Sequence, residues 1–119
     1  MSLTDKNEAE NKTYYLKGGD KKPTLELTLY DDDGEVHNLT GATNAKLVVA
    51  QAVGGRRVVD NGSMTFASDR TTGVVKYTWA GTELRAGEYL MEVIVDYGLS
   101  TQESFPRGSY YALNIVDHL

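Results

Sequence analysis

A run of three carboxylates before a glycine is the stretch of this sequence with the clearest potential for chemistry. Aspartates 31–33 precede Gly34, and loops rich in carboxylate oxygens are the usual ligands of Ca²⁺. An EF-hand loop drawn on this stretch would need its first ligand at Leu29 and its bidentate glutamate at Thr40, and neither residue can serve. A weak calcium site stays open as the alternative. We interpret the run as a solvated hairpin tip, because Asp-Gly supplies the positive φ angles of a tight turn.

The other residue types that carry chemistry are sparse. His37 and His118 are far apart in the sequence, and neither has a metal-binding companion at a usable spacing. We therefore expect each to be a surface or strand-edge histidine. The chain has no cysteine, which excludes a disulfide framework and a thiolate nucleophile. It also has no Gly-x-Ser-x-Gly motif. We assign no catalytic residue, no metal ligands and no cofactor, and expect that the protein is not an enzyme.

The net charge of the chain is −5, from 12 basic and 17 acidic residues. This charge argues against a nucleic-acid partner, because that affinity depends on clustered Lys and Arg. Arg56 and Arg57 form one tight basic pair beside two glycines, and we interpret them as residues of a hairpin loop.

No apolar run approaches the ~20 residues of a membrane helix, so we expect no membrane insertion. Residues 1–12 are polar and predict a disordered lead-in rather than a signal peptide.

The elements that position these residues are expected to be strands. Short runs rich in Val, Leu, Thr and Tyr are separated by glycines, and residues 25–30 alternate between apolar and polar or tyrosine side chains. Asn61 and Gly62 form a strong two-residue hairpin signal. The chain length suits one domain, which we place at residues 13–117. We predict an all-β fold, an Ig-like antiparallel β-sandwich of about eight to ten strands.

Residues 84–89 read Leu-Arg-Ala-Gly-Glu-Tyr and lead into an alternating strand. This pattern predicts a tyrosine corner, in which the hydroxyl of Tyr89 bonds to the backbone a few residues upstream. In antibody domains a cysteine lies two residues after that tyrosine, and here the position is Met91. The pattern therefore predicts a sandwich without the disulfide. We also expect Leu84 to close the end of the core.

Two pairs of adjacent tyrosines lie near the ends of the predicted domain, Tyr14 with Tyr15 and Tyr110 with Tyr111. Neighbouring strand residues point to opposite faces, so one ring of each pair must point away from the core. Such a ring can simply lie over the outer sheet or under a loop. Exposed tyrosine is also enriched at binding surfaces. We hypothesise that one outward tyrosine of each pair marks a surface that binds a partner.

The order of these segments resembles the N-terminal domain of the upper baseplate proteins of siphophages that infect lactic acid bacteria and other Gram-positive hosts. The family shows, in this order, a Leu-x-Leu strand closed by Asp-Gly, Leu-Thr-Gly-Ala, Gly-Val-Val-x-Tyr, Leu-x-Ala-Gly-x-Tyr and a closing Ser-x-x-x-Phe strand. In this chain these motifs correspond to residues 25–34, 39–42, 73–77, 84–89 and 101–105, and Thr101 stands at the place of that serine.

The resemblance implies a structural component of a phage or prophage tail tip that attaches the host-recognition apparatus. Its implied partners are other tail and baseplate proteins, with several copies of this chain in the assembly. The implied location is the virion, after assembly in the cytoplasm of the bacterial host. The alternative is a carbohydrate-binding or adhesin-like sandwich on a virion or cell. That alternative needs an exposed aromatic, and we expect Trp79, the one tryptophan, to lie in the core.

Overall fold

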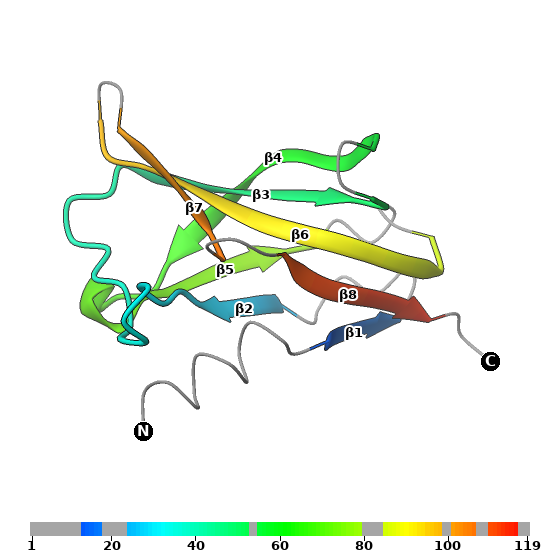
Figure 1. The fold of residues 1–119 in the computed structure, drawn as a ribbon, viewed down its shortest axis with the longest axis horizontal. Coiled ribbons are helices and arrows are strands. Elements are labelled where there is room, and N and C mark those ends of the chain that lie inside the picture. Colours follow the sequence, from blue (N-terminus) through cyan, green and yellow to red (C-terminus); the bar gives the residue numbers. More distant parts are fainter. Residues whose placement is uncertain are drawn as a thin grey trace.

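The computed structural model describes residues 13–17, 24–52, 55–79, 85–98, 101–106 and 110–116. Within 13–17 it describes the backbone and the side chain of Tyr14. The predicted lead-in (residues 1–12) and Leu84 lie outside the described residues. The described part forms eight strands and one short 3₁₀ helix (Figure 1): β1 (Thr13–Lys17), β2 (Thr24–Thr28), β3 (Asn44–Ala50), β4 (Arg57–Phe66), η1 (Arg70–Thr72), β5 (Val74–Thr78), β6 (Gly87–Asp96), β7 (Gln102–Phe105) and β8 (Tyr111–Val116).

The strands form one continuous sheet in the order β1-β8-β6-β3-β4-β5-β2, with β7 also paired to β6. Every pairing is antiparallel except that of β1 with β8, which is parallel and corrects the expectation of a purely antiparallel fold. Thr13 pairs with Ala112, so nearly the whole chain separates the two strands. No tight turn links β1 to β8, and the antiparallel geometry that a hairpin imposes is not required there.

β4 connects the two halves of the sheet, because it pairs with β3 along one part and with β5 along another. Most of the strand pairs with β3, whereas Thr65 and Phe66 pair with β5. Asn61, predicted to begin a hairpin turn, lies inside β4 with a φ of 59°. The ladder between β3 and β4 shifts register just after the pair formed by Leu47 and Gly62. The Asn-Gly pair is therefore part of a bulge, which bends a strand where a turn would reverse it.

The two halves of the sheet enclose one hydrophobic core, which makes the fold an all-β sandwich. The alternation predicted from the sequence is present: buried and half-exposed residues alternate along β6, and Leu25 and Leu27 of β2 are buried on one face. Trp79 lies in this core with 3% of its surface exposed, as predicted. Fully buried side chains come from both halves and include Leu27, Leu47, Val49, Val75, Met91, Val93, Phe105 and Ile115.

The tyrosine corner is confirmed. The hydroxyl of Tyr89 donates a 2.7 Å hydrogen bond to the carbonyl oxygen of Arg85, and the tyrosine side chain is buried. Met91, at the position of the antibody cysteine, is 1% exposed and packs in the core. An apolar contact thus occupies the place of a disulfide, and the corner fixes where the chain enters β6.

β7 and β8 follow each other along the same edge of β6 (Figure 1). Phe105 of β7 pairs with Val93, and Tyr111 of β8 pairs with Met91. Phe105 and Tyr111 are six residues apart, whereas their partners Val93 and Met91 are two apart, so β7 and β8 do not form one continuous register along β6. Tyr110 lies directly before β8. Within the described residues, no helix is long and apolar enough to cross a membrane.

Candidate functional site

The four tyrosines of the candidate partner surface differ in burial. Tyr110 is 41% exposed, whereas Tyr111 is 1% exposed and belongs to the core. The ring of Tyr14 packs edge-on against that of Tyr111, with centroids 6.4 Å apart. The backbone of Tyr15 pairs with Asn114, and its side chain lies outside the described part of the structure. Of the three whose side chains the structure describes, Tyr110 is therefore the most exposed.

Tyr14 connects β1 to the core. Its burial, with a smaller contribution from Tyr30, raises the pKa of its phenol above the usual value. The phenol is therefore neutral at physiological pH, and its ring contact with Tyr111 fastens the edge strand to β8. Tyr14 is accordingly a packing residue of the sheet edge.

A hollow of about 270 Å³ lies beside Tyr110 on the outer face of the sheet. Its apolar wall comes from β3 and β6, where Val48 is 6% exposed and Leu90 is half-buried. An outer sheet face is normally polar, so these side chains are unusual at outward positions. Glu92 and Arg57 add charges at the hollow, which is lined by Val48, Ala50, Ala52, Gly55, Arg57, Leu90, Met91, Glu92 and Tyr110.

Two further hollows lie around the first. One of about 320 Å³ shares Ala52 and Leu90 with it and extends over β8 to Asn114. The next, of about 450 Å³, shares Gln51 and Tyr89 with the second. Together the three hollows follow the outer face from Tyr110 to the tyrosine corner. These neighbouring hollows form a candidate surface for a ligand or a partner.

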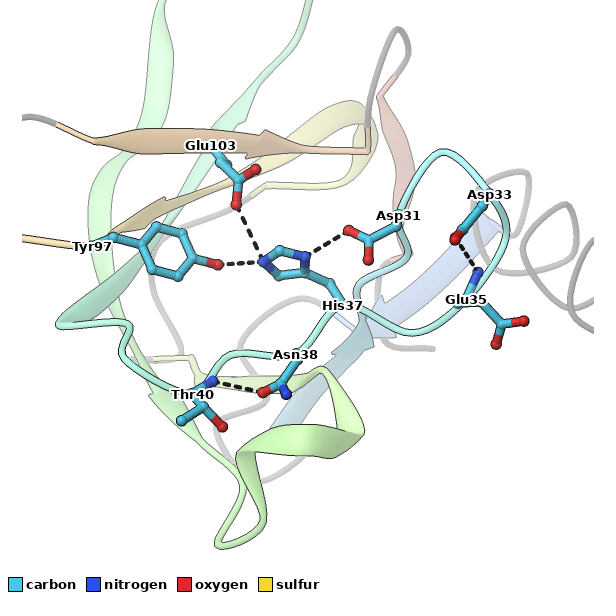
Figure 2. Close-up of polar contacts among 8 residues, drawn as sticks. All are labelled: Asp31, Asp33, Glu35, His37, Asn38, Thr40, Tyr97 and Glu103. Atoms are coloured by element: carbon cyan, nitrogen blue, oxygen red, sulfur yellow. Dashed lines mark hydrogen bonds and ion pairs between the residues drawn. The ribbon is translucent and has the colours of Figure 1, made fainter.

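A second cluster gathers around His37 in the connection between β2 and β3 (Figure 2). Its Nδ1 lies 2.6 Å from Oδ1 of Asp31, and its Nε2 lies 3.2 Å from Oε1 of Glu103. The hydroxyl of Tyr97 also contacts Nε2. The histidine side chain is 13% exposed. For His37 the expectation of a surface or strand-edge histidine is corrected, because carboxylates and a phenol surround both ring nitrogens. His118 lies outside the described residues.

The sheet register explains why this cluster could not be found from the sequence. Glu103 pairs with the fully buried Val95, so its side chain is on the inner side of β7, at the end of the sandwich. The connection from β2 places His37 over the same end, 4.9 Å from the ring of Phe105. Tyr97 comes directly after β6. Two segments about 60 residues apart, 31–37 and 97–103, thus meet at one imidazole.

The cluster cross-links two loops. Because a carboxylate only accepts hydrogen bonds, Nδ1 of His37 donates to Asp31, which orients the ring toward Tyr97 and Glu103. Asp–His–hydroxyl is also the order of a nucleophilic triad. The three hollows described above, however, are lined by other residues. Among the described residues, no group of three or more His, Cys, Asp and Glu is arranged to hold a metal ion.

The aspartate run forms the predicted hairpin tip. Gly34 has a φ of 87°, and its N–H donates to the carbonyl oxygen of Asp31. Oδ1 of Asp33 accepts a 2.9 Å hydrogen bond from the N–H of Glu35 (Figure 2). The carboxylate of Asp31 is directed to His37 instead. The hydrogen bonds of Asp31 and Asp33 to His37 and Glu35 therefore both stay within the connection between β2 and β3.

The fold defines an all-β protein of the sandwich class. No protein-family model matches the chain, and no curated protein is significantly similar to it. Among solved structures, the chain is similar to CopC from Methylosinus trichosporium OB3b, with a TM-score of 0.52 and 13% sequence identity. The match covers 90% of this chain and 86% of that chain. At this identity the likeness concerns the fold alone.

Proposed function

We propose that this chain is an attachment module, a rigid sandwich that holds a partner protein on the outer face of β3, β6 and β8. The observation that carries the proposal is the 41% exposed ring of Tyr110 beside a hollow with an apolar wall. Exposed aromatic side chains next to an apolar hollow are typical of the residues that dominate binding energy at interfaces. The single core behind this face holds it in one shape, which lowers the entropic cost of binding.

We place this module in the tail tip of a phage or prophage. Support comes from the order of five sequence motifs shared with the N-terminal domain of siphophage upper baseplate proteins. The partners would be other tail and baseplate proteins, and several copies would act together, so that weak contacts gain avidity. The protein would be assembled in the host cytoplasm and function in the virion. We also propose that its sandwich is an Ig-like variant, on the strength of the tyrosine corner.

The test is co-expression with tail proteins encoded beside the gene, followed by purification and affinity measurement. Tyr110→Ala and Leu90→Glu should each weaken binding at least about tenfold, because one removes the exposed ring and the other places a charge in the hollow. Val36→Glu is the matched control, since Val36 is 42% exposed but lies in the loop after β2, away from the hollow. Equal affinity of all three variants and the wild type would refute the proposed surface.

The second candidate is a carbohydrate-binding sandwich. The same exposed Tyr110 favours it, because a sugar ring can stack on an aromatic face while Glu92 and Arg57 bind hydroxyl groups. Trp79 cannot contribute, because it is buried. Binding of the purified chain to host-wall polysaccharide, abolished by Tyr110→Ala, would support this candidate. Binding to tail proteins alone would reject it.

A further inference from the structure

Three arginines line the hollow of about 450 Å³ at the tyrosine-corner end of the sandwich. Arg56 and Arg57 lie at the start of β4, and Arg85 lies shortly before β6. Tyr89 and Gln51 also contribute to the lining. The adjacent pair seen in the sequence thus becomes a group of three around one concave surface.

The tyrosine corner determines the position of the third arginine. The carbonyl oxygen of Arg85 accepts the hydrogen bond from the buried Tyr89, which fixes the Arg85 backbone at the rim of the hollow. The residue itself is exposed, as are Arg56 and Arg57. An exposed arginine therefore starts from a fixed backbone position.

Within the part of the chain that the structure describes, the charges of this group are incompletely compensated. The other described basic side chains have partners: Lys46 pairs with Asp96, Lys76 lies 3.9 Å from Glu26, and the guanidinium of Arg70 lies over the ring of Phe66. Within the group, Arg57 lies 2.9 Å from Asp60.

By contrast, neither Arg56 nor Arg85 forms an ion pair with any residue that the structure describes. In a chain with a net charge of −5, exposed arginines are expected to pair readily with carboxylates, yet these two have no such partner among the described residues. Here they converge on a hollow instead. This placement leaves positive charge that an external anion can neutralise.

We propose that this hollow binds the phosphate groups of a soluble phosphate-bearing ligand. Guanidinium groups form paired N–H···O bonds with phosphate oxygens, and the planar fork of arginine suits this geometry better than lysine does. A volume of about 450 Å³ is in the range of small-molecule sites and exceeds what one phosphate needs. The site is therefore suited to a ligand with more than one phosphate, or with a phosphate joined to a polar body.

Calorimetric titration with inorganic pyrophosphate and tripolyphosphate tests the site. Wild-type protein should bind both, with tripolyphosphate tighter and with affinity falling as salt rises. Arg56→Gln and Arg85→Gln should each weaken binding about tenfold. The matched control is Lys76→Gln, which also removes one positive charge. Lys76 lies on β5 and pairs with Thr65, at the end of β4 opposite to Arg57. This variant should leave affinity within about twofold.

Arg85→Gln keeps the backbone carbonyl that accepts from Tyr89, so the corner is retained, and an unchanged melting temperature checks this. Absence of binding to wild-type protein at millimolar probe overturns the proposal. So does equal weakening by Lys76→Gln, which would indicate a general charge effect. Binding to phosphatidylglycerol vesicles but to neither soluble probe would reject a soluble ligand.

The site and the proposed function can fail separately. The arginine variants leave Tyr110 and Leu90 unchanged, so partner binding should persist in them. Conversely, Tyr110→Ala should leave pyrophosphate binding unchanged, because Tyr110 does not line the arginine hollow.

Discussion

The hydroxyl of Tyr89 and the carbonyl oxygen of Arg85 are joined by a 2.7 Å hydrogen bond between residues four apart in the chain. The tyrosine is 4% exposed, so this bond is partly shielded from water. It anchors the start of β6 and, through the same carbonyl, the backbone of an arginine at the rim of a hollow. One local contact therefore serves both the stability of the sandwich and the placement of a charge.

Removing this hydroxyl should destabilise the protein without changing its fold. Tyr89→Phe leaves the carbonyl of Arg85 without its buried donor and should lower the free energy of unfolding by about 1–2 kcal/mol. Urea denaturation measures the change. Tyr110→Phe is the control, because Tyr110 is 41% exposed, and its hydroxyl can be removed at little cost. Equal effects of the two variants would contradict the role of the corner.

The His37 cluster should show energetic coupling between its members. A double-mutant cycle with His37→Ala and Asp31→Ala should give a coupling energy of about 0.5–1 kcal/mol, moderate because the Asp31 side chain is 41% exposed. The free energies of unfolding of the four proteins provide the cycle. Additive effects of the two substitutions would show that the 2.6 Å contact contributes nothing to stability.

Stability should fall in acid partly through Asp96. The hydrogen bond from Gln102, and further the ammonium of Lys46, hold the pKa of this carboxyl below its usual value, although partial burial opposes them. A lowered folded-state pKa means stability that is present above the unfolded-state pKa of about 4 and is lost as pH falls through the folded-state pKa.

Thermal melts between neutral pH and pH ~3 would measure this loss. Asp96→Asn should melt at a lower temperature than the wild type at neutral pH. The difference in melting temperature should shrink as the pH falls and Asp96 of the wild type becomes protonated. A difference that stays constant with pH would show that Asp96 does not take part in the linkage.

Gly73 should tolerate substitution worse than Gly41. Both have positive φ angles, 72° and 91°. A Cβ at Gly73 would lie 2.8 Å from the carbonyl oxygen of His37 and 2.9 Å from that of Leu29, whereas a Cβ at Gly41 meets nothing within 4 Å. Gly41→Ala should cost about 1 kcal/mol from backbone strain alone. Gly73→Ala should cost at least about 2 kcal/mol more, because backbone atoms must shift. Equal losses in urea denaturation would contradict this close approach.

The sequence alone determined the features that depend on neighbours in the chain. The alternation along β6 marks its buried face because strand side chains point to opposite sides. The Tyr89 corner and the hairpin tip at Gly34 could be predicted because each hydrogen bond spans a few residues. The Asn61 prediction was wrong, since the same Asn-Gly pair fits a bulge within β4 as well as a turn.

Tertiary structure decided which residues meet. His37 gains Glu103 and Tyr97 because the sheet register and the β2–β3 connection bring two distant segments, 31–37 and 97–103, to one end of the sandwich. Arg85 is likewise distant in sequence from Arg56 and Arg57, and only the folded chain brings the three residues around one hollow. The choice between Tyr110 and Tyr111 as the exposed ring depended on where the ladder to β6 resumes. Such contacts depend on strand pairing across the whole sheet, and no spacing within a single segment specifies them.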